Sequence, residues 1–178
     1  MSSFQKGIGI ILRQHKVSEA DKFVKVFTRD RGIVTFIARG ARKSTSRKSS
    51  HLDTLNEIRY EASRGGNPQI LNQVETIHHF QSLKKQLTSI RSGFYLSELI
   101  QAVVPEEQGD EVLYDHLIST LIKLSQNVDS RQCLVDFQLF LIAHLGFPPP
   151  QSQEPQVIIT HLEEIAEKTF SSRQLKIR

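Results

Sequence analysis

Before residue 80, apolar and polar residues alternate along Lys6–Arg13 and Leu52–Ala62, which is the pattern of strands with one buried face, and Lys22–Thr28 is rich in β-branched and aromatic residues. The alternation is clearest in Leu52–Ala62, where Ile58 and Tyr60 face one way and Arg59 faces the other. Arg29–Gly32 is expected to form a tight turn, with Gly32 in the left-handed conformation. The other four predicted strands are Lys6–Arg13, Lys22–Thr28, Ile33–Ala38 and Ile70–Ile77, and Gln14–Asp21 is expected to be a polar turn.

Five short antiparallel strands with one long polar loop predict a small barrel of the OB type. A flat sandwich usually needs more strands. After residue 80 the apolar residues follow helical spacing instead. The fold class is therefore β + α with two modules, an OB-fold nucleic-acid-binding domain over residues 1–80 and an α-helical bundle over residues 81–178.

Four helices are expected in the second module. The segment 132–145 is apolar almost all round, so we expect it to be the buried central helix, with Gly146 ending it. Pro105 should end the first helix, and Asp110 is a candidate N-cap for the second. The predicted helices are Leu83–Val104, a second from Asp110 that includes Leu113–Leu124, Gln132–Leu145 and Val157–Phe170.

A basic, glycine- and serine-rich stretch follows the third predicted strand. Such a segment lacks the apolar residues needed to join a core, so we expect a solvated loop whose charges stay available to a polyanion. Residues 1–64 carry 14 Lys/Arg and 6 Asp/Glu, a balance of +8, whereas residues 65–178 carry −4. The proposed phosphate-binding residues of the loop are Arg39, Arg42, Lys43, Arg47 and Lys48.

Four further cations lie near other predicted strand ends, where they would extend the same track: Arg13, Lys16, Arg29 and Arg31. Barrels of this type also stack bases on aromatic rings. The candidates are Phe27, Phe36 and Tyr60, but large apolar side chains are usually buried, so we expect these three in the core. Binding would then rest mainly on the phosphate backbone, with an affinity that falls steeply with salt.

The sequence gives little support for an enzyme or a metal protein. The single cysteine, Cys133, rules out an internal disulfide and any zinc site made of several cysteines in one chain, and it is expected to be an inert buried thiol. No phosphate-binding loop motif is present. His78 and His79 lack further ligands at metal spacing, and Glu57 and Glu61 are expected to form a salt-bridged solvent face with Arg59 between them. No cofactor, export signal or membrane span is expected, which favours a cytoplasmic protein.

Several stretches together resemble the RecO family of bacterial recombination mediators. SEADK at 18–22 leads into VFTRDRG at 26–32, and ARGARK at 38–43 is followed by Ser46 and Arg47. Farther on, FLIAHLGFPP at 140–149 is similar to a helix end of the family, and FSSRQL at 170–175 to its C-terminal segment. The resemblance spans most of the chain in the family's order, with the barrel first and the helices second.

The resemblance implies a protein that binds single- and double-stranded DNA, anneals complementary strands and, with RecR, helps load RecA on DNA covered by the single-strand-binding protein SSB. It also implies that the helical module receives the SSB tail; Lys84, Lys85 and Arg131 are candidates to meet a peptide carboxylate, although ordinary surface residues would look the same. Many family members carry a four-cysteine zinc element where this chain has QSQEPQ at 151–156, so we expect a compact member of the family.

Two alternatives fit the residues without that resemblance. An RNA-binding OB-fold protein would have the same charge distribution. A protein-interaction scaffold would use mainly the helices and would lack DNA affinity at moderate salt. Annealing of complementary DNA strands, without a preference for RNA, separates the mediator from both.

Overall fold

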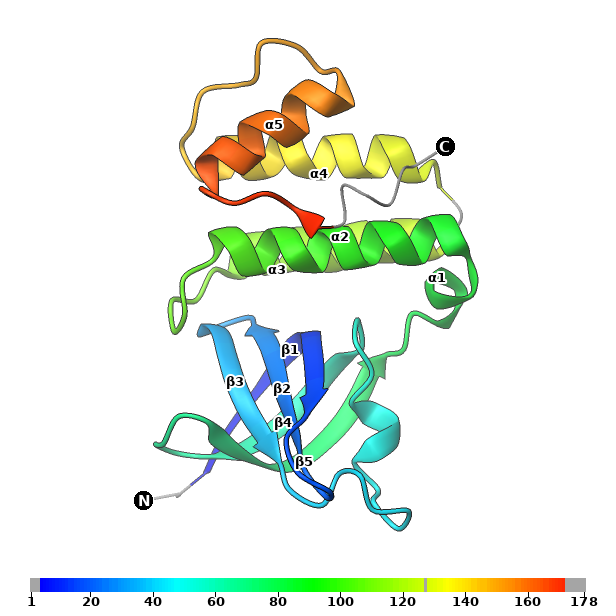
Figure 1. Cartoon of the computed structure of the whole chain (residues 1–178), viewed down its shortest axis with the longest axis vertical. Coiled ribbons are helices and arrows are strands. Elements are labelled where there is room, and N and C mark those ends of the chain that lie inside the picture. Colours follow the sequence, from blue (N-terminus) through cyan, green and yellow to red (C-terminus); the bar gives the residue numbers. More distant parts are fainter. Residues whose placement is uncertain (1–3, 127, 172–178) are drawn as a thin grey trace. The chain divides into compact units, whose positions relative to one another are not determined.

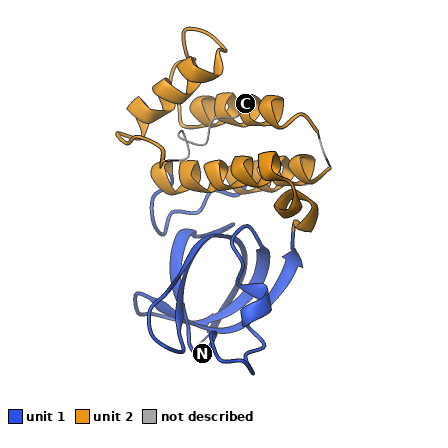
Figure 2. Cartoon of the chain, turned by 45° about the vertical axis from the view of Figure 1, so that its right-hand side comes forward, with its two compact units in different colours: residues 1–79, 104–111 blue, residues 80–103, 112–178 orange. Residues whose placement is uncertain are grey.

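The computed structural model describes residues 4–126 and 128–171, which fold into two compact units (Figures 1 and 2). The first unit contains the chain up to His79 together with Val104–Glu111. The second contains Phe80–Val103 and the chain from Val112 onward. The segment predicted to resemble the family's C-terminus lies mostly at 172–175, outside the described residues.

The first unit is a closed five-stranded barrel with the strand order β1-β2-β3-β5-β4. All neighbouring strands are antiparallel except β3 and β5, which pair in parallel through Phe36–Gln69 and Ile37–Ile70. This is the OB-type architecture that the strand pattern predicted. The strands are β1 (Phe4–Lys16), β2 (Lys22–Thr28), β3 (Gly32–Ala38), β4 (Glu57–Ser63) and β5 (Gln69–His78).

The first strand is longer than its sequence pattern indicated. Residues 14–16 were expected in a polar turn, but Gln14, His15 and Lys16 pair with Val24, Phe23 and Lys22 of β2. The extra length has a structural reason, because β1 pairs with β4 through Phe4–Ile10 and with β2 through Gly9–Lys16. One strand that serves two partners closes the sheet and leaves no open edge.

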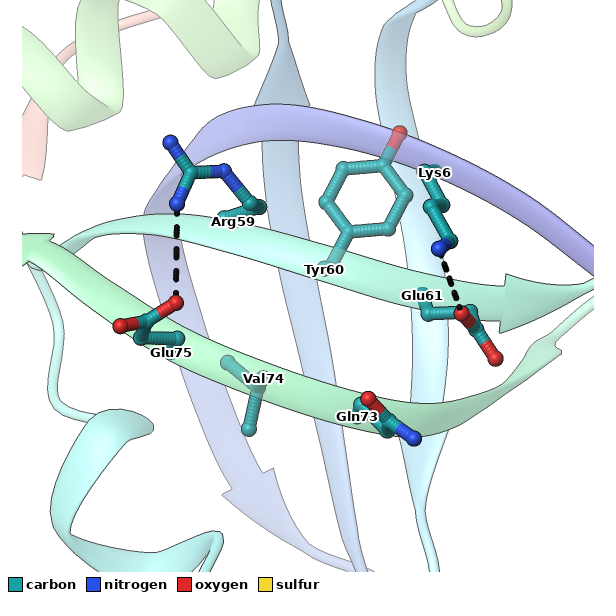
Figure 3. A pocket seen from close by; sticks show the side chains of 7 residues that line it. All are labelled: Lys6, Arg59, Tyr60, Glu61, Gln73, Val74 and Glu75. Atoms are coloured by element: carbon teal, nitrogen blue, oxygen red, sulfur yellow. Dashed lines mark ion pairs between the residues drawn. The ribbon is translucent and has the colours of Figure 1, made fainter.

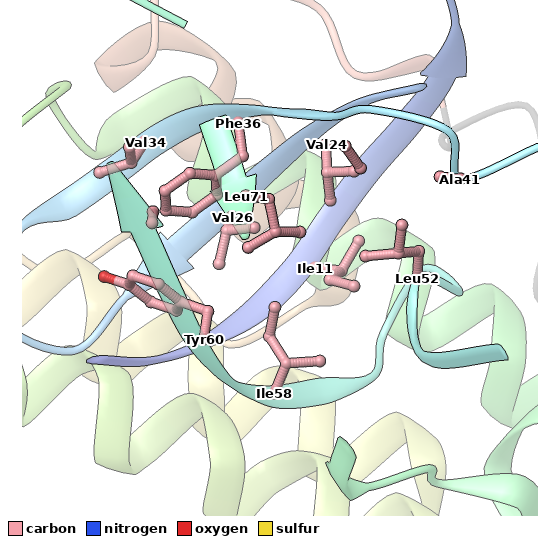
Figure 4. Close-up of a cluster of buried hydrophobic side chains, with 12 residues drawn as sticks. Ile11, Val24, Val26, Val34, Phe36, Ala41, Leu52, Ile58, Tyr60 and Leu71 are labelled. Carbon is pink, nitrogen blue, oxygen red and sulfur yellow. The ribbon is translucent and has the colours of Figure 1, made fainter. Parts of the chain in front are cut away.

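The barrel core is filled by the inward-facing residues of all five strands (Figure 4). Phe36 and Tyr60 meet there with ring centroids 4.8 Å apart, a tilted packing typical of aromatic pairs. Ala41 and Leu52, from the chain between β3 and β4, are also fully buried in it. The other core residues are Ile11, Val24, Val26, Val34, Ala38, Ile58, Ala62 and Leu71.

The second unit consists of helices, as the spacing predicted, with differences at their ends. The single helix expected over 83–104 is two helices, because Gln86 adopts an extended conformation between them. The last helix is shorter than expected and ends at Ile165. The helices are α1 (Gln81–Lys85), α2 (Leu87–Val103), α3 (Glu111–Ser125), α4 (Ser130–His144) and α5 (Pro155–Ile165).

Helix α4 supplies much of the core of this unit. The Phe137 side chain of this helix is fully buried. Gln138 donates a 2.6 Å hydrogen bond to the hydroxyl of Tyr95 on α2. Asp129 caps its N-terminus by accepting from the backbone of Arg131 and Gln132, and Gly146 ends it with φ +79°, as predicted. It is not buried all round, because Arg131, Gln132 and Asp136 are exposed.

Cys133 of the same helix is buried, and this desolvation raises the pKa of its thiol. The thiol is thereby kept protonated, which fits the inert cysteine predicted from the sequence.

The segment Val104–Glu111, called here the return segment, leaves α2 and packs on the barrel. Glu106 forms a parallel bridge with Ile33, and the backbone N–H of Glu107 donates to the Ile33 carbonyl at 3.3 Å. Helix α2 ends before Pro105, as expected of a residue without an N–H. The predicted second domain, residues 81–178, is therefore interrupted by a stretch that belongs to the barrel unit.

Candidate nucleic-acid interface

The basic segment after β3 is fastened to the barrel rather than freely solvated. The backbone N–H of Gly40 donates to the Asp21 carboxylate at 2.8 Å, and that of Arg42 donates to the Ala20 carbonyl at 2.9 Å. Ala41 between them is fully buried. The expectation of a solvated loop is therefore wrong for its backbone, which the β1–β2 turn holds at one end of the barrel.

The five predicted loop cations divide into two groups. Arg39, Lys43 and Arg47 are exposed, and no hydrogen bond or ion pair engages their side chains within the described part of the chain. The guanidinium of Arg42 donates to the Ser18 carbonyl, which ties the loop to the β1–β2 turn. Exposed cations in a fixed backbone can bind phosphates without first breaking other contacts.

Lys48 has a structural role. Its ammonium is half-buried and donates a 2.7 Å hydrogen bond to the Leu71 carbonyl of β5. Burial lowers the pKa of this ammonium from its usual value, because desolvation disfavours the charged form. Lys48 thus fixes the far end of the loop on the barrel, and we do not count it among the exposed cations.

Strand register brings Lys16 and Lys22 to the same end of the barrel. They lie directly opposite each other where β1 ends and β2 begins, and Lys22 also lies opposite Ala38, the last residue of β3. Like charges opposite each other are unfavourable unless an anion lies between or near them. Lys16 was predicted, whereas Lys22 was missed because only the register reveals its neighbour. We call Lys16, Lys22, Arg39, Arg42, Lys43 and Arg47 the basic end.

Arg29 and Arg31 lie at the opposite end of the barrel, in the β2–β3 turn. Six residue steps separate the pair Thr28–Gly32 from the pair Lys22–Ala38, which is about 20 Å along the strands. Arg29 forms an ion pair with Glu111 at 3.1 Å, and Arg31 donates to the Gln69 side chain at 3.2 Å. The prediction that these two residues extend the track from the loop is therefore wrong.

Arg13, the remaining predicted cation, is exposed on the outer face of β1. It lies opposite Lys25 of β2, whose ammonium is 3.4 Å from the Glu106 carboxylate of the return segment. Lys25 is three residues from Lys22 and three from Thr28, so Arg13 lies midway between the two ends of the barrel and is not part of the loop.

The three aromatic candidates for base stacking are all in the interior. Phe27 and Phe36 have no exposed surface and Tyr60 has 2%, so the expectation that they belong to the core is confirmed. Burial, with a smaller contribution from Asp30, raises the pKa of the Tyr60 hydroxyl, while hydrogen bonds with Thr28 and Arg31 act in the opposite direction. None of the three rings can receive a base.

The acidic pair of β4 does not form a catalytic site. Glu61 pairs with Lys6 at 3.4 Å and Arg59 pairs with Glu75 at 3.5 Å, along a shallow pocket of about 160 Å³ (Figure 3). Arg59 is thus engaged by β5 and not by its neighbours on β4.

Glu57 was expected on the solvent face with Glu61 but is buried. Its carboxylate contacts Nδ1 of His78 at 2.5 Å. Register places Glu57 opposite Ile10 of β1 and His78 of β5, next to the register shift between Glu57 and Ile58, so its carboxylate is covered instead of facing solvent beside Glu61. Within the described residues, no group of three or more His, Cys, Asp or Glu side chains is placed to hold a metal ion, and no helix is long and apolar enough to cross a bilayer.

An OB-type barrel with a cationic end, followed by a helical unit, defines a class of proteins that bind oligonucleotides or related polyanions. Comparison with known families makes this specific. Residues 1–80 match the family described as Recombination protein O N terminal, and residues 85–155 match Recombination protein O C terminal. The chain belongs to the RecO family, as the sequence motifs indicated.

Among similar proteins are several named DNA repair protein RecO. That of Dehalococcoides mccartyi is 32% identical over 140 residues, which are 79% of this chain and 55% of the relative. That of Symbiobacterium thermophilum is 32% identical over 142 residues, covering 79% and 56%, and that of Clostridium novyi is 34% identical over 146 residues, covering 82% and 57%. The chain spans little more than half the length of these relatives.

Proposed function

We propose that this chain is a non-enzymatic mediator of DNA repair and recombination. In this proposal it binds single- and double-stranded DNA, anneals complementary strands and, together with RecR, helps load RecA on SSB-coated DNA. The observation that carries the proposal is the basic end, where Arg39, Lys43 and Arg47 are exposed, with no competing partners among the described residues, beside the opposed pair Lys16 and Lys22.

The chemistry of this end suits binding to the phosphate backbone. Arginine and lysine side chains neutralise phosphates and release counterions, which gives affinity without sequence recognition. A protein that holds two strands by their phosphates reduces their repulsion while their base edges remain free to pair. Annealing requires that combination.

The partner proteins enter the proposal through the family. The helical unit would receive the tail of SSB, and RecR would act with the chain in loading RecA. Lys85 and Arg131 are exposed on that unit and remain candidates to meet a peptide carboxylate.

The test is annealing of complementary oligonucleotides, bare and coated with SSB, by the wild-type chain and by an Arg39→Ala, Lys43→Ala, Arg47→Ala variant. We expect the variant to anneal bare strands at least about tenfold more slowly, since three phosphate contacts are lost. Lys123→Ala with Lys168→Ala is the control, because it removes exposed cations of the helical unit to which the proposal assigns no contact.

Equal loss in both variants would refute a specific role of the basic end. Competition by unlabelled RNA, if stronger than that by DNA of the same sequence, would favour the RNA-binding alternative instead.

A further inference from the structure

A row of four side chains crosses the outer face of the barrel next to the basic end. His15 of β1 lies opposite Phe23 of β2, Phe23 lies opposite Ile37 of β3, and Ile37 lies opposite Ile70 of β5. Their sequence neighbours Val24, Phe36, Ala38 and Leu71 point into the barrel core, so these four must point outward. Four adjacent strands make the row about 14 Å wide.

The row offers aromatic and aliphatic surface to solvent. His15 is exposed, and Phe23, Ile37 and Ile70 are each partly exposed. The rings of His15 and Phe23 are 5.4 Å apart and meet edge to face at 82°. This surface is the part of an OB barrel, the outer face of the second and third strands, on which oligonucleotides commonly lie.

Cations border the row on both sides. On one side, Arg13 precedes His15 by two residues on β1, and Lys25 follows Phe23 by two residues on β2. On the other side, Arg39 follows Ile37 by two residues. Two residues along a strand correspond to about 7 Å. Glu106 neutralises part of the charge of Lys25. Asp21, an acid on the other side, has its carboxylate engaged by the backbone N–H of Gly40.

We propose that this row, with His15 and Phe23 as the stacking rings, receives the bases of single-stranded DNA while Arg13, Lys25 and Arg39 hold the flanking phosphates. The inference rests on the proposed DNA binding and adds a base-contacting surface to it. Apolar surface with Arg13 and Lys25 on one side and Arg39 on the other complements a single strand, whose bases are planar and whose backbone is anionic. An apolar peptide would not need the cations, and duplex DNA would keep its bases out of reach.

The test compares binding of a dT oligonucleotide with that of an abasic oligonucleotide of the same length at pH 8. A variant carrying His15→Leu and Phe23→Leu keeps apolar volume but removes both rings. We expect it to bind the dT strand about tenfold more weakly, which is the scale of stacking one base, and the abasic strand as the wild type does. The matched control is His79→Leu with Phe147→Leu, one histidine and one phenylalanine exposed elsewhere.

A second measurement does not depend on a loss of binding. The chain contains no tryptophan, so Phe23→Trp places a single reporter in the row. We expect its emission to be quenched by the dT strand and unchanged by the abasic strand. Reduced binding of both strands by the leucine variant, or no change with either, would overturn the inference, as would a tryptophan that responds equally to both.

The two proposals fail separately. If the Arg39→Ala, Lys43→Ala, Arg47→Ala variant binds both strands like the wild type, the basic end does not bind the DNA phosphates. If that variant loses affinity for both strands but the leucine variant loses none, the basic end still binds DNA and the stacking row is refuted.

Discussion

The two ends of the barrel both carry arginines, but the surroundings of those arginines differ. At the basic end, Arg39 and Arg47 extend into solvent without partners in the described part of the chain. At the β2–β3 turn, Arg29 is paired with Glu111 and Arg31 with Gln69. The number of cations near a strand end therefore does not define a site, because partner groups decide which charges remain available.

The return segment creates much of this difference. It brings Glu106 to Lys25 and Glu111 to Arg29, and its backbone packs directly on the turn. A side-chain carbon at Gly32 would clash with the Gln108 carbonyl, and one at Gly109 would clash with the Asp30 carbonyl. The barrel end at the β2–β3 turn, called here the turn end, is thus closely packed and its charges are paired. The charges of the basic end are not balanced in this way.

The largest effect is expected from Gly32→Ala, which disrupts the packing of the return segment on the β2–β3 turn. Gly32 has φ +67°, so alanine there is strained, and its methyl group would also displace the return segment. We expect the free energy of unfolding to fall by about 3 kcal/mol, measured by urea denaturation. DNA affinity below the transition should be unchanged, since the basic end is not involved.

Gly65→Ala is the matched control for this change. Gly65 also has a positive φ, +77°, but a side-chain carbon there would meet nothing within 4 Å. This substitution should lower the free energy of unfolding only by the backbone strain, about 1 kcal/mol. Equal destabilisation by the two substitutions would mean that packing of the return segment contributes nothing to the turn end.

A smaller effect is expected from pH at the same end. Burial raises the pKa of Tyr60 above its usual value of 10.0, so above about pH 10 the unfolded chain ionises while the folded chain holds its proton. The contribution of the protonated Tyr60 hydroxyl to the free energy of unfolding is therefore fully present below pH 10. It is lost as the pH rises further, by up to about 1.4 kcal/mol per pH unit for each such group.

Tyr60→Phe removes this titrating group and should make the loss of stability between pH 10 and pH 11 shallower. Tyr95, whose pKa is also raised by burial, contributes its own share in both proteins and so cancels in the comparison. A decline in the variant as steep as that of the wild type would show that Tyr60 ionises as readily folded as unfolded.

The fold was predictable to a large extent because its determinants are local. The β-branched and aromatic residues of Lys22–Thr28 predicted β2 with its observed ends, and Gly32 and Gly146 were recognised as the residues that turn the chain. The break at Gln86 and the extension of β1 to Lys16 were not predictable in this way. Both occur in polar sequence, where tertiary pairing rather than local pattern decides the conformation.

The candidate site was only partly predictable. Composition identified the basic loop, but it treated Arg29, Arg31 and Lys48 like Arg39, because the acids and carbonyls that engage them come from distant segments. The row from His15 to Ile70 was missed for the same reason. Its four members come from four strands, and only their register places them side by side.

The most direct test of the central claim is the salt dependence of single-stranded DNA binding by variants at the two ends. The logarithm of affinity falls with the logarithm of salt concentration by about 0.7 per phosphate neutralised. The Arg39→Ala, Lys43→Ala, Arg47→Ala variant should lower this slope by about 2, whereas Arg29→Ala with Arg31→Ala should leave it unchanged. A slope lowered at the turn end, or unchanged at the basic end, would contradict the account.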